Sequence, residues 1–389
     1  MTRSKPDPSS PSSLSSPSLR PTEAPSKVSR CPAFFACLAA ILSLSLLFAG
    51  CSTLDERQRA WIFQPSDKNW GVADSALQEV WIDFHSGATG RATRLNGLWL
   101  AAEPVEKAAP QTQLSLATTV RTAFKTPLIN ARTTSGDATR ATAGPVLLYL
   151  HGARWNVSGS IFRMRRMQEL GFSVLGVDYR GFGKSSAELP SEQMAYEDAR
   201  AAWDWLAARY PDRPRYIFGH SLGGPIAIHL ASEVEDESGT MVEGTFSSMA
   251  DVVSSFKWGW MPLPPVGPLL TQRFEAVRKV GRIGSPLLVV HGGQDQLIQP
   301  RLGKKLFDAA AEPKRFVLVE NGSHHNTNSV GQGQYRQAIA DLFGLPAHNA
   351  AHHAAHNIKP SPAQPTRPAP RDPEESARLT LGASPKGIS

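Results

Sequence analysis

Short apolar segments recur between residues 146 and 320, and each is hydrophobic over most of its length rather than at alternate positions. That pattern is typical of strands buried on both faces of a sheet. The segments are Val146–Leu150, Ser173–Asp178, Arg215–Gly219, Met241–Glu243, Pro286–His291 and Arg315–Glu320. Helical patterns lie between or after them, at Ser160–Leu170, Ser191–Tyr210, Gly223–Val234, Arg301–Ala311 and Gln334–Phe343. This alternation predicts an α/β fold with a mostly parallel central sheet flanked by helices.

Two further strand patterns, Val80–Phe84 and Leu95–Leu100, come before the alternating part of the chain. No helical pattern separates them, so they are expected to form an antiparallel edge of the sheet. In open sheets of this class, ligands bind beyond the carboxyl ends of the strands. Candidate chemistry is therefore sought in the loops that follow the strands.

Three stretches lack a core-forming pattern. Residues 1–50 contain a Ser- and Pro-rich segment followed by an apolar run, residues 103–143 are rich in Ala, Thr and Arg, and residues 346–389 are rich in Pro, Ala and His. Such compositions bury too little apolar surface to fold. We therefore expect one α/β domain over 52–345, with a disordered insertion near 103–143 and a disordered tail over 346–389.

The N-terminal apolar run is typical of a membrane address. Lys27 and Arg30 precede the apolar residues 33–50, and Cys51 follows directly. A positive flank, an apolar stretch and small residues before a cleavage point are the parts of a secretory signal peptide. The ending LFAGC resembles the lipobox of bacterial lipoproteins, which implies lipidation of Cys51. The alternative is an uncleaved anchor, because 18 apolar residues can just span a bilayer. Either interpretation predicts a tethered domain on the extracytoplasmic (periplasmic) side of a cell or outer membrane.

Charge and cysteine content narrow the possible functions. The chain has 389 residues and a formal net charge of +7, but the excess falls in 1–30, 101–145 and 346–389, which read as disordered. A basic groove for nucleic acid is therefore not predicted, whereas a weakly basic tail near an anionic membrane is allowed. The cysteines are at 31, 37 and 51, so a disulfide, a thiolate nucleophile or a Cys-based metal site is not expected beyond residue 51.

Histidines gather in the tail at 348, 352, 353 and 356. They could chelate a metal, but without preorganised partners they read more simply as a solvated segment. No cofactor or metal is therefore expected in the domain.

A nucleophile motif follows the strand Arg215–Gly219. The sequence GHSLG places Ser221 between that strand and a helical pattern, with glycines two residues before and two after it. A serine in this context sits on a sharp turn at a helix N-terminus, where small flanking residues let strand and helix approach closely. Developing negative charge is favoured at that position. Ser221 is therefore the candidate nucleophile.

A serine hydroxyl needs a base and an orienting carboxylate to become nucleophilic. Asp295 follows the strand Pro286–His291 after two glycines, and His324 follows the last strand. Both positions lie at carboxyl ends of strands, as Ser221 does. Two alternatives stay open, because His325 adjoins His324 and Glu243 follows another strand.

At these residues the chain resembles the α/β-hydrolase superfamily, in particular bacterial small-lid serine hydrolases of the lipase, esterase and depalmitoylase type. The matching motifs are HG at 151, DYRGFGKS at 178, GHSLG at 219, HGGQD at 291 and GSH at 322. The resemblance implies Ser221 as nucleophile, His324 as base and Asp295 as acid. It also implies an oxyanion hole formed by the backbone amides of Ala153 and Leu222.

The substrate pocket is less certain than the reaction class. Residues 245–282 are rich in apolar side chains and form either a small lid over an acyl pocket or ordinary core packing. Arg154 and Trp155 could meet a substrate or be structural. We expect a serine hydrolase of esters or thioesters that acts on a small-molecule or lipid-like acyl substrate. The alternatives are a peptidase or amidase, and a non-catalytic lipoprotein on a hydrolase scaffold.

Overall fold

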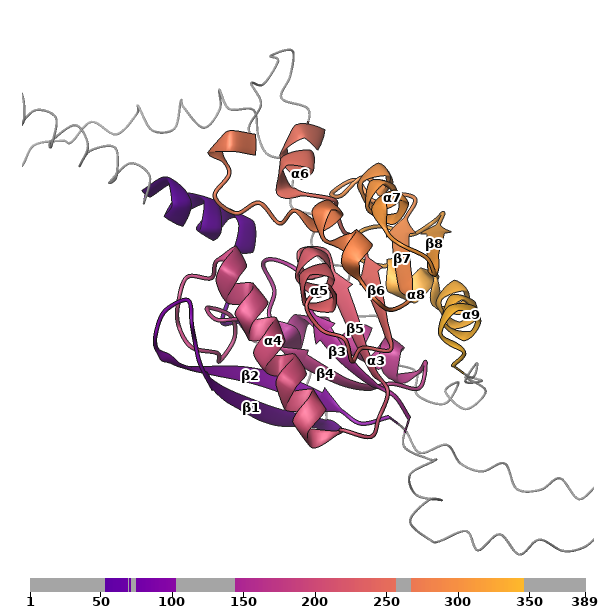
Figure 1. The fold of residues 1–389 in the computed structure, drawn as a ribbon, viewed down its shortest axis with the longest axis horizontal. Helices are drawn as coiled ribbons and strands as arrows, with labels where there is room; N and C mark the ends of the chain where they lie inside the picture. Colours follow the sequence, from indigo (N-terminus) through magenta and orange to yellow (C-terminus); the bar gives the residue numbers. More distant parts are fainter. Residues whose placement is uncertain (1–52, 69, 71–74, 103–143, 257–266, 346–389) are drawn as a thin grey trace, which may run out of the picture. The chain divides into compact units, whose positions relative to one another are not determined.

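The computed structural model describes residues 53–68, 70, 75–102, 144–256 and 267–345 (Figure 1). The chain divides into two compact units, Met1–Asp55 and Glu56–Ser389, and the fold and site described below lie in the second unit. The apolar run 33–50, Cys51, the insertion 103–143 and the tail 346–389 lie outside the described residues, so the domain boundaries drawn from the sequence stay predictions.

The described strands form one eight-stranded sheet in the order β1-β2-β4-β3-β5-β6-β7-β8. β1 pairs antiparallel with β2 and β2 with β4, and every pairing from β4 to β8 is parallel. The strands are β1 Leu77–His85, β2 Ala92–Leu100, β3 Val146–Leu150, β4 Ser173–Val177, β5 Arg215–His220, β6 Gly239–Glu243, β7 Leu287–Gly292 and β8 Lys314–Val319. The predicted α/β class and antiparallel edge are confirmed.

Helices cover both faces of this sheet (Figure 1). The longer helices are α3 Ile161–Gln168, α4 Glu192–Arg209, α5 Gly223–Ala231, α7 Pro300–Ala309 and α9 Gln332–Phe343, with shorter α6 Met249–Ser255 and α8 Thr327–Val330. Single 3₁₀ turns lie at Val157–Ser160, Gly267–Leu269, Ala276–Arg278 and Val280–Arg282. A further helix spans 53–63. The order α3, α4, α5, α7, α9 follows the helical patterns of the sequence.

The two faces of the sheet have separate cores, and β3 shows why its sequence is apolar throughout. Val146, Leu148 and Leu150 pack into the core that α4, α5 and α7 cover, whereas Leu147 and Tyr149 pack into the core under α3 and α9. Successive side chains of a strand point to opposite faces, so a strand with two covered faces needs apolar residues at every position.

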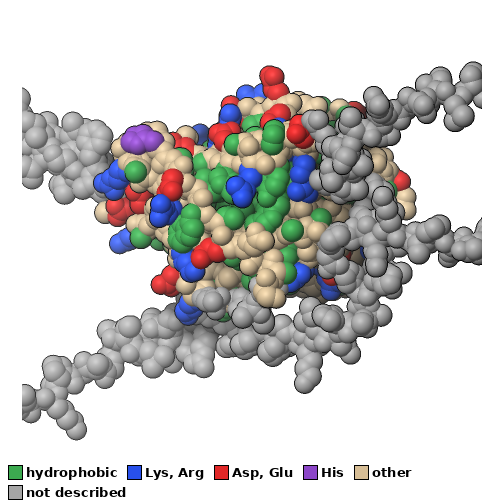
Figure 2. Space-filling view, turned by 90° about the horizontal axis from the view of Figure 1, so that it is seen from below, with side chains coloured by type: hydrophobic (Ala, Val, Ile, Leu, Met, Phe, Trp, Pro, Cys, Tyr) green, Lys and Arg blue, Asp and Glu red, His purple; other side chains and the backbone are tan. Residues whose placement is uncertain are grey.

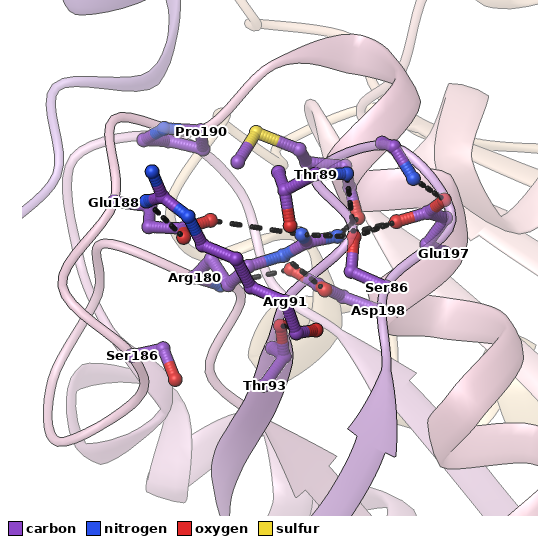
Figure 3. A network of polar contacts seen from close by, with 12 residues as sticks. Ser86, Thr89, Arg91, Thr93, Arg180, Ser186, Glu188, Pro190, Glu197 and Asp198 are labelled. Carbon is purple, nitrogen blue, oxygen red and sulfur yellow. Dashed lines mark hydrogen bonds and ion pairs between the residues drawn. The ribbon is translucent and has the colours of Figure 1, made fainter.

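The β1–β2 hairpin is tied to α4 by the fully buried guanidinium of Arg180 (Figure 3). Arg180 donates to Asp198 Oδ1 at 2.8 Å, to Glu197 Oε2 at 2.9 Å and to Ser86 Oγ at 2.8 Å. Asp198 is itself fully buried and also accepts from the Arg180 backbone amide at 2.8 Å. Charge-assisted hydrogen bonds from one planar group fix geometry as well as charge. This cluster, named here the Arg180 network, therefore holds the antiparallel edge against the helical layer.

Figure 2 shows the domain from below the view of Figure 1, with hydrophobic side chains gathered at the middle of that face and Lys and Arg side chains standing among them. On the β1–β2 hairpin the same combination occurs at Trp81, which is 41% exposed and has the Arg94 guanidinium 5.7 Å from its ring centroid. Arg94 also pairs with Asp83 at 2.6 Å. Charged groups thus cover part of the exposed apolar surface of the edge strands.

Candidate active site

Ser221 occupies a strained turn between β5 and α5. Its φ is +54°, in the left-handed region that residues with a Cβ rarely adopt. A Cβ at Gly219 would lie 2.3 Å from the Gly223 carbonyl oxygen, and one at Gly223 would lie 2.1 Å from the Leu150 carbonyl oxygen. Only glycine fits at these two positions, which is the physical reason for the GHSLG spacing. The turn holds the Ser221 hydroxyl beyond the carboxyl end of the sheet.

The structure brings Ser221, His324 and Asp295 together from the loops after β5, β8 and β7. His324 Nε2 lies 3.0 Å from Ser221 Oγ, and His324 Nδ1 lies 2.8 Å from Asp295 Oδ2. A neutral imidazole that donates from Nδ1 to the carboxylate presents an acceptor at Nε2 to the hydroxyl. The chain of contacts can therefore take a proton from Ser221.

Asp295 is held as a carboxylate by surrounding donors. Burial acts to raise its pKa, but hydrogen bonds from His291 and His324 and from the Ile298 amide outweigh burial and lower the pKa below its usual range. Its Oδ1 accepts from the backbone amides of Leu297 and Ile298 at 3.0 and 2.8 Å. Its side chain is fully buried. An ionised, fixed carboxylate is what an imidazole needs to keep one orientation.

The two alternative residues have other contacts. His325 stacks on Trp155, with ring centroids 5.9 Å apart. Glu243, the last residue of β6, accepts from Arg163 Nε at 3.1 Å and from the Tyr335 hydroxyl. It does not contact His324 among the hydrogen bonds of the described residues.

The loop after β3 carries the second predicted oxyanion amide. Ala153 and Leu222 both line the pocket that contains Ser221, and a Cβ at Gly152 would lie 3.1 Å from Ser221 Cβ. The next residue, Arg154, has a φ of +77° and donates its amide to the Phe63 carbonyl at 2.8 Å. The loop thus passes close to the nucleophile and is tied to helix 53–63.

Asp178 also holds the loop after β3 in place. Its Oδ1 accepts from the Val157 amide at 2.5 Å, and its backbone carbonyl accepts from the Ser185 hydroxyl at 2.7 Å. Burial raises the pKa of Asp178 to about 7, and burial lowers the pKa of the neighbouring His151 to about 4. Asp178 therefore connects the loop after β3 to the turn that follows β4.

A pocket of about 190 Å³ surrounds Ser221 and His324, and its walls are mostly apolar. The apolar lining residues come from helix 53–63, α6 and the segments next to α6 and Asp295: Trp61, Ile62, Phe246, Met249, Val252, Phe256, Leu297 and Ile298. The charged residues among the described lining are Arg154 and Arg163, both cations. Such a pocket accommodates an apolar group next to the reactive serine and offers no carboxylate to a cationic substrate.

The pocket lining answers part of the question about residues 245–282. Phe246 and Phe256 line the pocket, whereas Leu270 packs against the main core. The segment 257–266, with Trp258, Trp260, Met261, Leu263 and Val266, lies outside the described residues. The described part of residues 245–282 therefore contributes both to the pocket and to the core.

Two contributors to the site were not expected from the sequence. Helix 53–63 supplies Trp61 and Ile62 to the pocket, although its polar stretch gave no clear helical period. Arg163 of α3 is 2% exposed and donates to backbone carbonyls of the loop that carries His324. Arg163 shares its helix with Arg165 and Arg166, and only its tertiary contacts distinguish it from them.

The described residues contain no group of three or more His, Cys, Asp or Glu side chains that could hold a metal ion. In the same part of the chain, no helix is both long and apolar enough to cross a membrane. The histidines of the tail, 348–356, and the predicted lipidation site Cys51 lie outside the described residues.

Comparison with known proteins places the fold. A family model described as serine aminopeptidase, S33, matches residues 142–262. An uncharacterized protein of Mycobacterium tuberculosis is 34% identical over 186 residues, which cover 47% of this chain and 64% of that protein. A lysophosphatidylserine lipase of Xenopus tropicalis is 33% identical over 228 residues, 52% of this chain and 58% of that protein. Each match spans less than two thirds of the relative's own length.

A solved esterase of Pyrococcus furiosus superposes with a TM-score of 0.50, covering 73% of this chain and 97% of the esterase at 15% identity. That likeness concerns the fold. Together with the strand order and the family match, it decides the assignment. The chain has the α/β-hydrolase fold. Its sheet carries the expected mixed topology with one antiparallel edge.

Proposed function

We propose that this α/β-hydrolase cleaves carboxylic ester or thioester bonds through an acyl-enzyme on Ser221. The observation that carries the proposal is the unbroken series of contacts from Asp295 through His324 to Ser221 at the floor of an apolar pocket. The similarity to a lysophosphatidylserine lipase agrees with an acyl substrate that has an apolar chain.

In the first half-reaction, Ser221 Oγ bonds to the carbonyl carbon while its proton moves to His324 Nε2. The carbonyl oxygen gains negative charge, which the amides of Ala153 and Leu222 stabilise; such donors contribute about 3–4 kcal/mol each. The bond to the leaving oxygen or sulfur then breaks, and that atom takes the proton from His324. Water next attacks the acyl carbon, gives a proton to His324, and the acid leaves as Ser221 regains its hydrogen.

A peptidase is the second candidate, because the matching family model is described as a serine aminopeptidase. An aminopeptidase holds the free α-ammonium of its substrate, and a carboxylate is the natural partner for that cation. The described residues lining this pocket include two arginines and neither Asp nor Glu. The lack of a carboxylate among these described residues favours a neutral or anionic ester over an aminoacyl substrate.

The test is labelling of the full chain with a fluorophosphonate, followed by turnover of p-nitrophenyl esters of increasing chain length and of aminoacyl p-nitroanilides. We expect labelling at Ser221, none in Ser221→Ala, and hydrolysis of esters over anilides. Folded wild-type protein that stays unlabelled would support a non-catalytic scaffold. Faster turnover of anilides than of esters would support the peptidase.

We further propose that the chain is lipidated at Cys51 and tethered to a membrane on its extracytoplasmic side. The support is the sequence alone: a positive flank, an apolar run over 33–50 and the LFAGC ending. Mass spectrometry of the N-terminal peptide from the membrane fraction should show a diacylglyceryl group on Cys51, absent in Cys51→Ser. A mature N-terminus upstream of residue 33 would instead indicate an uncleaved anchor.

A further inference from the structure

Arg163 stands out among the buried groups of the domain because the proposed chemistry does not use it. It is 2% exposed, and its Nη2 donates to the carbonyl oxygens of His324 and His325 at 3.2 and 3.0 Å. Its Nε donates to Glu243 Oε1 at 3.1 Å. One planar guanidinium therefore contacts two successive peptide groups of the loop that carries the base and, from another edge, a carboxylate.

Glu243 and Tyr335 fix that guanidinium in turn. Both side chains are fully buried, Glu243 at the end of β6 and Tyr335 in α9. The Tyr335 hydroxyl donates to Glu243 Oε2, so each carboxylate oxygen has a donor. We name Arg163, Glu243 and Tyr335 the Arg163 network. It connects α3, β6 and α9 to the loop after β8.

Stability alone does not explain such a cluster. Moving a cation and a carboxylate out of water costs several kcal/mol per ion, and apolar side chains of similar volume often stabilise a fold as well. Unlike apolar side chains, Arg163 makes directional hydrogen bonds, and these hold the His324 and His325 carbonyls at fixed places. A shift of about 1 Å in a catalytic group can cost about 100-fold in rate.

We propose that Arg163 is a positioning residue of this hydrolase: it fixes the backbone at His324 and His325 so that the imidazole of His324 stays aimed at Ser221, and Glu243 with Tyr335 fixes Arg163. His220 Nε2, 3.2 Å from the same His324 carbonyl, supplies a further contact from the end of β5. The inference rests on the proposed function.

The network also sets the charge around the base. Burial lowers the pKa of His220 well below its usual range, and the Arg163 cation lowers it further. A bare cation beside His324 would likewise oppose the imidazolium that forms during the reaction, and Glu243 offsets this effect. The groups that face the His324 loop come from five places: His220 at the end of β5, Ser221 directly after it, Glu243 of β6, Asp295 after β7 and Arg163 of α3. Within the loop, His325 adjoins His324, and Arg154 faces His325.

The test compares full-length wild type with Arg163→Lys, Glu243→Gln and the matched control Arg180→Lys, which alters a buried arginine outside the site. Tm, kcat, KM and the pH profile of ester turnover are measured well below each Tm. Lysine keeps the charge, but its single nitrogen cannot occupy the places of both Nε, which donates to Glu243, and Nη2, which donates to the two carbonyls. We expect Arg163→Lys to lower kcat about 100-fold while KM changes less than about threefold. Glu243→Gln should move the acid limb of kcat/KM to lower pH by about one unit.

Arg180→Lys should lower Tm while its kcat stays within about threefold of wild type. The inference is overturned if Arg163→Lys retains kcat within that range, or if Arg180→Lys loses as much kcat as Arg163→Lys. Should Arg163→Lys fail to fold, the isosteric Glu243→Gln decides: an unmoved acid limb and a wild-type kcat overturn the inference. Wild type that is neither labelled nor active refutes the proposed function instead, and the inference falls with it.

Discussion

The domain buries two arginines against carboxylates, and the two clusters differ in what they hold. In the Arg180 network the guanidinium pairs with the buried Asp198 and reaches Ser86 on the β1–β2 turn, so it joins one structural element to another. In the Arg163 network the guanidinium pairs with Glu243 through Nε, and its Nη2 donates to peptide carbonyls next to the base. Similar chemistry thus supports the scaffold in one network and the reacting groups in the other.

The largest difference in kcat between the candidate site and the Arg180 network is expected from a matched pair of carboxylate variants. Asp295→Asn should lower kcat about 10⁴-fold, because an amide can present its N–H to His324 and favour the wrong tautomer. Asp198→Asn, in the Arg180 network, should lower Tm with kcat per folded molecule within about threefold of wild type. Steady-state ester turnover at a temperature where both variants are folded checks this. Equal losses of kcat would show that the regions are not separate.

Removing the scaffold arginine should have the largest effect on stability. Arg180→Met leaves Asp198 and Glu197 without their cation in a buried place, and breaking a buried pair in this way costs about 3–5 kcal/mol. Urea unfolding monitored by tryptophan fluorescence gives the free energy of unfolding. A loss below about 1 kcal/mol would mean that the pair contributes little beyond what methionine packing replaces.

The free energy of unfolding should depend on pH through the carboxylate of Asp295. Hydrogen bonds lower the folded-state pKa of Asp295, so its ionised form stabilises the native state above the unfolded carboxyl value of about 3.9, and this contribution is lost as pH falls below that value. The difference in free energy of unfolding between wild type and Asp295→Asn should therefore be largest near neutral pH and shrink below about pH 4. A difference that is independent of pH would contradict the assignment.

The smallest effects are expected from single hydroxyls, one in each network. Tyr335→Phe removes the hydrogen bond to Glu243, and Ser86→Ala removes an acceptor for Arg180 and a donor to Glu197. Each should cost about 1–3 kcal/mol, since a buried partner is left unsatisfied. Only Tyr335→Phe should also lower kcat, by several-fold. The free energy of unfolding and kcat are measured on the same preparation of each variant. These measurements reveal whether stability can fall without a loss of kcat.

Much of the fold could be predicted because the parallel strands are buried on both faces. The pattern at Val146–Leu150 matched β3 residue for residue, whereas β6 was predicted to begin at Met241 and begins at Gly239. Gly239 is a poor signal of a strand on its own, and the pairing of Gly239 and Thr240 with the neighbouring strands comes from tertiary context. Helix 53–63 was missed because its contacts are distant: Arg59 donates to the Pro190 carbonyl and Gln58 to that of Leu269.

The candidate site likewise has residues that the sequence predicts and one that it does not. Ser221, Asp295 and His324 follow strands, so topology alone brings them to one edge of the sheet. Arg163 lies on a helix among other arginines, and nothing in its local sequence separates a buried cation from a solvated one. Which of the three arginines turns inward depends on the peptide groups that His324 and His325 present from a loop about 160 residues away.

The turn at Ser221 places backbone strain in the native state at the position of the proposed nucleophile. A residue with a Cβ held at a φ of +54° costs about 1–3 kcal/mol that glycine would not incur. An inert Ser221→Gly protein should therefore melt at a higher temperature than the active one. Keeping a serine at this position lowers the stability of the domain. A domain without a catalytic role would gain nothing from that loss of stability.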